Sequence, residues 1–210
     1  MEKTKVKTVL LLGDSIRQNY QEYVKERLKD SIDVLYTRDN GRFCQYTLRY
    51  MHEWVNTLTN GRGDVIDIVH FNCGLWDILR LSNEDRPFTD EKLYGELLRR
   101  IYDRILFLCP NAVLIYALTT EVIEPGFEPG AELGYRCNKD IARYNDIAKN
   151  LFDRLNVEVN DLWSVSRALP QEAYSDSVHF QTELGIEALG RKVAECIEKK
   201  AAMQDGRQIW

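Results

Sequence analysis

The sequence has no long hydrophobic run, because none of its apolar stretches approaches the ~20 residues that a membrane-spanning helix needs. The start of the chain, MEKTKVKTVLLL, is basic and then apolar, which is similar to a signal peptide. Its apolar part is too short for one, and no small-residue cleavage site follows it. We therefore predict a cytoplasmic protein with no membrane partner.

Cysteine and histidine are scarce. The five cysteines lie far apart and form no CxxC pair, a pattern typical of reduced thiols rather than of a disulfide framework or a zinc site. The three histidines also lack the spacing of metal ligands. The sequence therefore predicts no metal site.

Positive charge is also in short supply. Lysine and arginine number 28 against 33 acidic residues, for a net charge of −5, so no broad basic surface for nucleic acid is expected. The segment GDSIRQN has neither the GxGxxG nor the Gly-Lys-Ser pattern of a phosphate-binding loop. We predict no nucleic-acid partner and no nucleotide cofactor.

The composition itself is that of an ordinary globular protein. With 210 residues, of which 44% are hydrophobic, the chain can form one sizeable core. There are no internal repeats and no linker, so we predict a single domain over residues 1–210. The polar tail, residues 202–210, is expected either to fray or to dock on a partner. The sequence does not predict the oligomeric state.

Short apolar runs alternate about five times with longer stretches of helical periodicity. The predicted strands are residues 6–12, 32–36, 65–71, 112–118 and 157–159. The predicted helices are residues 18–28, 46–58, 89–108, 141–155 and a last one that begins at 182. This alternation predicts an α/β fold, a three-layer α/β/α sandwich around a central parallel five-stranded sheet.

Unusual polar groups follow the predicted strands. Gly13-Asp14-Ser15 follows the first strand, RDNGRF (38–43) the second, NCGLWD (72–77) the third, and DSVH (176–179) comes after the fifth. Ligands of open α/β sheets bind outside the carboxyl ends of the strands. We therefore expect these groups to gather at one edge of the sheet.

Ser15 and the string DSVH carry the elements of nucleophilic catalysis. A serine hydroxyl needs a base to take its proton, most often an imidazole held by a carboxylate. In a turn ahead of a helix, the Asp176 carboxylate can fold back onto Nδ1 of His179 and leave Nε2 free for Ser15. Without such partners, Ser15 would be an ordinary helix cap. We expect His70, within an apolar strand, to be a core residue and Asp14 to be structural.

Attack by a serine on an ester creates an oxyanion, which needs hydrogen-bond donors already in place. The candidate donors are the backbone N–H groups of Ser15 and Gly41 and the side-chain amide of Asn72. Alternatives stay open for two of them. Gly41 lies in NGR, which would also form an ordinary tight turn, and Asn72 could instead fix its own loop.

Taken together, these motifs resemble the SGNH (GDSL-type) hydrolase superfamily. GDS, a glycine in the second loop, an Asn/Gly/Asp motif after the third strand and DxxH before the last helix occur in order from Val9 to about Ile197. The resemblance implies a flavodoxin-like sandwich that hydrolyses esters without metal or organic cofactor. It implies that Ser15 is the nucleophile, His179 the base and Asp176 its orienting group, with Gly41 and an asparagine completing the oxyanion hole.

One motif departs from the family pattern. The third motif of the family is GxND, whereas this chain reads GLWD, with Trp76 where asparagine is expected. Asn72 lies two residues before the glycine and could supply the amide from there.

The segment EVIEPGFEPGAELGYR (121–136) is long, acidic and rich in glycine and proline. Long loops in compact domains are commonly functional, so we expect a wall or lid of the substrate pocket, with a loop of no function as the alternative. Three aromatic residues near this edge, Trp76, Phe127 and Tyr135, could stack on a sugar face or belong to the core.

These observations predict a serine esterase that hydrolyses short acyl esters, acetyl first, including O-acetyl groups on sugars. The expected partner is thus a small acyl ester, such as an acetylated sugar. A thioesterase, lysophospholipase or acyltransferase with the same triad is an alternative. The missing GxND asparagine keeps open another class, a binding module with weak catalysis.

Overall fold

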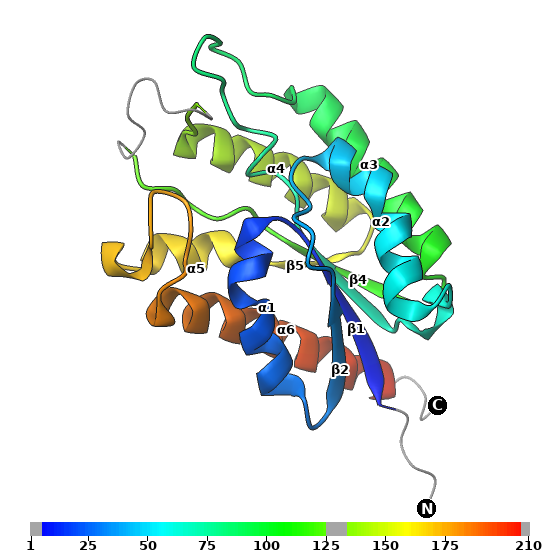
Figure 1. Cartoon of the computed structure of the whole chain (residues 1–210). Coiled ribbons are helices and arrows are strands. Elements are labelled where there is room, and N and C mark those ends of the chain that lie inside the picture. Colours follow the sequence, from blue (N-terminus) through cyan, green and yellow to red (C-terminus); the bar gives the residue numbers. More distant parts are fainter. Residues whose placement is uncertain (1–5, 125–133, 207–210) are drawn as a thin grey trace, which may run out of the picture.

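The structure, a computed structural model, describes residues 6–124 and 134–206. Its centre is a five-stranded parallel sheet with the strand order β2-β1-β3-β4-β5 (Figure 1). The strands are β1 (Lys7–Leu12), β2 (Ile32–Tyr36), β3 (Ile68–Phe71), β4 (Val113–Ala117) and β5 (Glu158–Asn160). The predicted α/β fold with a central parallel sheet is confirmed.

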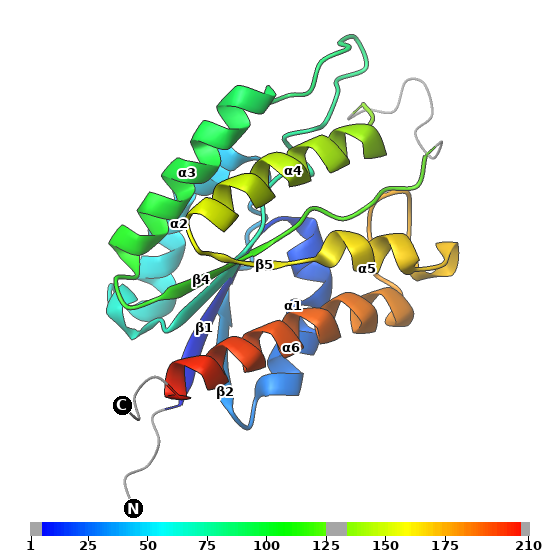
Figure 2. The same cartoon turned by 180° about the vertical axis from the view of Figure 1, so that it is seen from behind.

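Helices cover both faces of this sheet, which explains why its central strands are almost wholly apolar. On one face α1 packs against α6, beside α5, and on the other α2, α3 and α4 lie side by side (Figures 1 and 2). The helices are α1 (Ser15–Leu28), α2 (Cys44–Thr59), α3 (Glu91–Leu108), α4 (Asn138–Arg154), α5 (Leu162–Ala168) and α6 (Glu183–Gly206). Two short 3-10 helices are η1 (Gly63–Val65) and η2 (Gln171–Ala173).

Several elements differ from the prediction; for example, the strand predicted over 65–71 forms only over Ile68–Phe71, because Val65 ends η1. The first helix begins at Ser15 rather than at residue 18, because Asp14 caps it. The helix α5 has no predicted counterpart, because seven residues are too few to show helical periodicity. The last helix continues to Gly206, so the tail expected at 202–210 is helical over its first five residues.

The order of the sheet fixes where a ligand can bind. The chain passes from β1 outward to β2 and then returns to β3 on the other side of β1. In such sheets the crevice at this reversal, beyond the carboxyl ends of the strands, is the common binding site. The segments after β1 and β3 meet there, and they carry Ser15 and Asn72. Within the described residues, no helix is long and apolar enough to cross a membrane.

Candidate active site

The turn between β1 and α1 presents Ser15 at the crevice. Gly13 has a φ of +154°, and a Cβ there would lie 1.9 Å from Oδ1 of Asn72, so only glycine fits. Asp14 is buried and caps α1, since its Oδ1 accepts a hydrogen bond from the Ile16 N–H at 3.0 Å. Ser15 is therefore fixed as the first residue of the helix, directly beyond a buried strand.

Ser15, His179 and Asp176 are joined by hydrogen bonds. The Nε2 atom of His179 lies 2.9 Å from Oγ of Ser15, and its Nδ1 lies 2.8 Å from Oδ2 of Asp176. Because an ionised carboxylate only accepts hydrogen bonds, Nδ1 carries the proton and Nε2 is left to accept from the serine. This is the arrangement in which an imidazole can act as a general base toward a hydroxyl.

The carboxylate of Asp176 is itself held in place. Its Oδ1 accepts hydrogen bonds from the backbone N–H groups of Val178 at 2.7 Å and His179 at 2.8 Å. Partial burial acts to raise the pKa of Asp176, but the hydrogen bonds from the His179 ring and from the backbone outweigh it and leave the pKa lowered. Asp176 is therefore ionised at neutral pH.

The loop that carries His179 is anchored to α1. The Phe180 N–H donates to Oδ1 of Asn19 at 3.0 Å, one turn beyond Ser15, and the Ser175 N–H donates to the His179 carbonyl at 2.8 Å. Since α1 also carries Ser15, these bonds fix the imidazole relative to the hydroxyl that it faces. Asn19 thus holds the loop of His179 against α1, and no motif in the sequence pointed to it.

Two of the predicted oxyanion donors lie at the carboxyl edge of the sheet, and their role stays a prediction. As the first residue of α1, Ser15 has an N–H with no acceptor inside the helix. Asn72 is 7% exposed, directly follows β3 and lines the same small cavity as Asp14. Burial raises the pKa of Asp14, and the hydrogen bond from the Ile16 N–H and the neighbouring Asn72 side chain oppose that rise.

The third predicted donor is placed differently. The N–H of Gly41 donates to the Gly13 carbonyl at 2.9 Å, so it is not free to face an oxyanion in this structure. A Cβ on Gly41 would lie 2.7 Å from the same carbonyl oxygen, which explains the glycine by close packing of two loops. The prediction of Gly41 as an available donor is corrected accordingly.

The last residue of the GLWD motif, Asp77, joins two loops of the structure. Asp77 is fully buried, and its carboxylate accepts the N–H of Cys44, the first residue of α2, at 3.2 Å. The residue before α2, Phe43, offers no side-chain cap of its own. Burial raises the pKa of Asp77 to about 6, against the Cys44 N–H, which lowers it. Asp77 thus ties the loop after β3 to the loop after β2.

Two of the three aromatic residues that were predicted to contact a sugar lie within the described residues. Trp76 is half-buried, with the Arg136 guanidinium 5.8 Å from its ring centroid. Tyr135 is also half-buried, and its backbone forms two 2.9 Å hydrogen bonds with that of Arg80. Phe127 lies outside the described residues. Trp76 and Tyr135 are therefore neither core residues nor free surface, and sugar stacking stays a prediction.

Comparison with solved structures places this fold among known ones. A lipase/acylhydrolase from Enterococcus faecalis superposes with a TM-score of 0.70 at 18% identity, covering 92% of this chain and 96% of that one. An aryl esterase from M. smegmatis gives a TM-score of 0.67 at 15% identity, covering 92% and 99%. The chain has the fold of the GDSL-type lipases and esterases. The SGNH resemblance is thus confirmed at the level of the fold.

A carbohydrate acetylesterase from Sinorhizobium meliloti also shares the GDSL-type fold, with a TM-score of 0.62 at 15% identity and coverage of 92% and 99%. The sequence itself matches no family model and no curated protein. Identity below 20% means that these similarities establish the fold of this chain and no more.

Two arginines are buried at the carboxyl edge of this structure. Arg17 is completely buried and donates to the carbonyls of Thr37 at 2.8 Å and Gly13 at 3.2 Å, which joins the first two carboxyl-edge loops. Arg136 is 7% exposed and lies in the loop before α4. A charged residue in a sequence is expected at the surface, so only its three-dimensional partners could have shown this burial.

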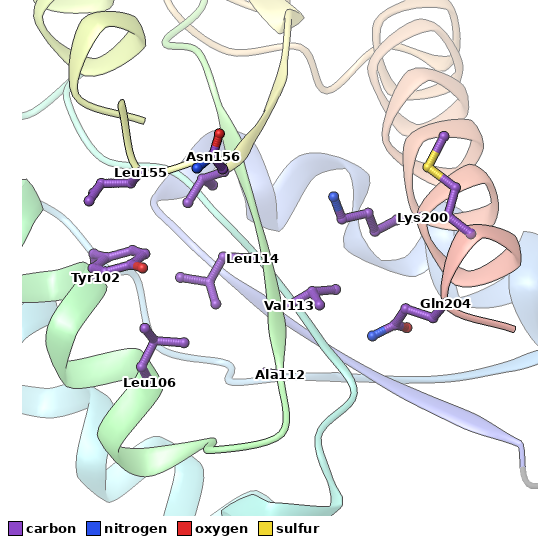
Figure 3. A pocket seen from close by; sticks show the side chains of 11 residues that line it. Tyr102, Leu106, Ala112, Val113, Leu114, Leu155, Asn156, Lys200 and Gln204 are labelled. Carbon is purple, nitrogen blue, oxygen red and sulfur yellow. The ribbon is translucent and has the colours of Figure 1, made fainter. Parts of the chain in front are cut away.

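A hollow of about 200 Å³ lies at the other end of the sheet (Figure 3). Its lining joins α3, the amino end of β4, the residues before β5 and the end of α6. The ammonium of Lys200 beside it is paired with Glu158 at 3.1 Å. Its lining contains no serine, cysteine or histidine, so it offers no counterpart of the Ser15–His179 pair. Among the described residues, no group of three or more potential ligands could hold a metal.

Proposed function

We propose that the protein is a serine esterase that hydrolyses short-chain acyl esters. One observation carries the proposal: the hydrogen-bonded chain from Ser15 Oγ through the His179 ring to the Asp176 carboxylate, with distances of 2.9 and 2.8 Å. A serine that only caps a helix does not need an imidazole hydrogen-bonded to its hydroxyl. The side chains of His179 and Asp176 are 30% and 53% exposed, so a substrate can reach them from solvent.

The reaction proceeds in two halves. Oγ of Ser15 attacks the ester carbonyl carbon while Nε2 of His179 takes the hydroxyl proton. The tetrahedral intermediate collapses, the C–O bond to the alcohol breaks, and the imidazolium returns its proton to the leaving alcohol. Water then attacks the acyl-serine with the same histidine as base, which releases the acid and restores Ser15. Asp176 stabilises the imidazolium in both halves by its bond to Nδ1.

The oxyanion is proposed to bind the Ser15 N–H and the amide of Asn72. Asn72 takes over the part that the family's GxND asparagine would have, because Trp76 occupies that position. Support comes from the position of Asn72, which directly follows β3 and whose Oδ1 lies against Gly13 in the turn that presents Ser15.

The acyl group is proposed to be acetyl, with acetylated sugars as the natural class of substrate. The structure of a carbohydrate acetylesterase shares the fold, and Trp76 and Tyr135 offer partly exposed rings near the Ser15 edge. A thioesterase, lysophospholipase or acyltransferase would use the same three side chains, and the choice of substrates in the test distinguishes them.

The first test is hydrolysis of 4-nitrophenyl acetate, butyrate and octanoate by the wild type, Ser15→Ala and Asn72→Ala. We expect the wild type to prefer acetate and Ser15→Ala to lose turnover. In Asn72→Ala, kcat should fall about 10²- to 10³-fold, the usual effect of losing one oxyanion donor. Ser31→Ala, which changes a serine in the turn after α1, is the matched control and should keep wild-type rates.

Activity that does not depend on Ser15 would contradict the mechanism and leave a binding protein on this fold. A steep preference for octanoate would overturn the acetyl assignment while retaining the triad. A wild-type rate in Asn72→Ala would remove that residue from the oxyanion hole.

A further inference from the structure

Arg136 is a buried cation at the carboxyl edge of the sheet. It is 7% exposed and lies in the loop between β4 and α4, next to the paired backbones of Tyr135 and Arg80. Its Nε donates to the carbonyl of Leu75 at 2.5 Å, and its guanidinium faces the ring of Trp76. Both contacts belong to the loop that starts at Asn72, so Arg136 is attached to the loop that carries a proposed oxyanion donor.

The charged groups that act on Arg136 belong to the same site. Burial lowers the pKa of Arg136 to about 10, and the negative charges of Asp14 and Asp176 oppose that change. These two carboxylates flank the nucleophile and the base, so the guanidinium sits within the field of both. It remains a cation at neutral pH.

Most of the donors of this guanidinium have no acceptor within residues 6–124 and 134–206. Arginine has five N–H donors, and only the one on Nε has an acceptor there, the carbonyl of Leu75. No carboxylate of the described residues forms an ion pair with Arg136, unlike Arg80, which pairs with Asp140 at 2.7 Å. Burying a cation is costly when its N–H donors lack acceptors, and an anion supplied by a ligand would reduce that cost.

We propose that Arg136 binds a carboxylate carried by the ester substrate, so that the enzyme selects acyl esters with one negative charge. The planar guanidinium matches a carboxylate through two parallel hydrogen bonds. A single charge is favoured over a dianion because Asp14 and Asp176 would repel the additional charge. This inference rests on the proposed esterase function and names the substrate class of that same site.

With an acetyl acyl group the carboxylate stands on the alcohol side of the ester, and a carboxylate on the acyl side would replace the acetyl assignment. Two substrate pairs distinguish these. The acyl-side pair is 4-nitrophenyl hemisuccinate against 4-nitrophenyl acetate. The alcohol-side pair is a monoacetylated methyl glucuronoside against the methyl glucoside acetylated at the same hydroxyl. The quantity measured is the ratio of kcat/KM for the charged substrate to that for the neutral one.

We expect the wild type to favour the charged member of one pair, which identifies the side. In Arg136→Met that ratio should fall about 10- to 100-fold, mainly through KM, as expected for the loss of a charge-assisted hydrogen bond. The ratio for Arg136→Lys should lie between those of the wild type and Arg136→Met, because lysine keeps the positive charge but lacks the two parallel N–H donors of the guanidinium. Arg99→Met, which removes an exposed arginine paired with Asp103 on α3, should keep the wild-type ratio.

A binding measurement separates this inference from the proposed function. Calorimetry on Ser15→Ala with succinate, methyl glucuronoside and methyl glucoside needs no turnover. The carboxylate site is supported if one charged compound binds and if adding Arg136→Met weakens that binding at least tenfold. The double variant must still unfold cooperatively. Equal ratios of kcat/KM in wild type and Arg136→Met, or no charged compound bound better than the glucoside, would overturn it. Absence of all ester hydrolysis would overturn the esterase proposal alone.

Discussion

Gly13 shows how a single residue joins two loops at the candidate site. Its φ of +154° and its contact with Oδ1 of Asn72 bring the segment after β3 against the turn that presents Ser15. A side chain at position 13 would displace the Asn72 side chain. The first glycine of GDS is thus required by the approach of an asparagine 59 positions further along the chain.

Gly13→Ala should therefore lower the free energy of unfolding by about 2–4 kcal/mol, from backbone strain together with a steric clash. The measurement is urea-induced unfolding followed by circular dichroism. Gly61→Ala is the matched control, since φ there is +79° and a Cβ meets no atom within 4 Å. It should cost about 1 kcal/mol from strain alone. Equal losses in the two variants would mean that the contact with Asn72 has no energetic weight.

Residue identity predicted which side chains gather at the edge of the sheet but not how each is used. The order of the motifs was sufficient to place Ser15, Asp176 and His179 together, and their catalytic role stays a prediction. The use of the Gly41 N–H by the Gly13 carbonyl could not be predicted, because it depends on how closely two loops approach. The burial of Arg136 could not be predicted either, because it also depends on how the loops pack.

At the scale of elements, the packing of α1 against α6 sets the geometry of the site. α1 begins with Ser15, and α6 follows the loop that carries His179. The two helices approach closely at Gly190, where a Cβ would lie 2.5 Å from the ring of Tyr23. This contact fixes the spacing of the helices and hence the support of the hydroxyl and the imidazole.

Gly190→Ala should push the helices apart and lower the free energy of unfolding by about 1–3 kcal/mol, despite the better helix propensity of alanine. Gly95→Ala provides the comparison within α3, because a Cβ there meets only a methyl group of Ile147 at 3.4 Å. We expect that variant to be as stable as the wild type or slightly more stable. The measurements are thermal unfolding and kcat of both variants. A stable, fully active Gly190→Ala would contradict the tight α1–α6 contact.

Most elements could be predicted from periodicity, because long helices and buried strands repeat their apolar residues regularly. The second strand was predicted with the observed ends, Ile32–Tyr36. Element ends were predicted less well where a cap decides them. Asp14 extends α1 to Ser15, and Asp161 starts the short α5 by accepting the N–H of Ser164 at 2.9 Å.

At the scale of the whole molecule, His70 of the central sheet contacts both the edge strand β5 and helix α1. It is completely buried in β3, its Nε2 lies 3.1 Å from Nδ2 of Asn160 in β5, and its ring contacts Tyr20 of α1 edge-on. Burial lowers its pKa from 6.5 to about 3. The folded protein therefore holds a neutral imidazole where the unfolded chain would take up a proton.

This difference makes His70 a source of acid sensitivity. Between pH 6.5 and about 3 the unfolded chain binds the additional proton, so the contribution of His70 to stability is complete above pH 6.5 and is lost as the pH falls. The free-energy difference between wild type and His70→Gln should fall by about 1.4 kcal/mol per pH unit in this range. Comparing variants removes the opposing contribution of Asp77, whose raised pKa favours folding at acidic pH.

The measurement is urea unfolding at a series of pH values from 7 to 4. His52→Gln, which changes the half-buried histidine of α2, is the control for replacing a histidine by glutamine. A constant difference between wild type and His70→Gln across the series would show that His70 does not titrate with folding.

The 164 positions that separate Ser15 from His179 also have a consequence for synthesis of the protein. At the usual 5–20 residues per second, the ribosome makes the histidine roughly 8–30 s after the serine. During that interval the nascent chain exposes a serine that has no base to activate it. Hydrolytic activity would then first arise once the two distant parts of the translated chain have come together.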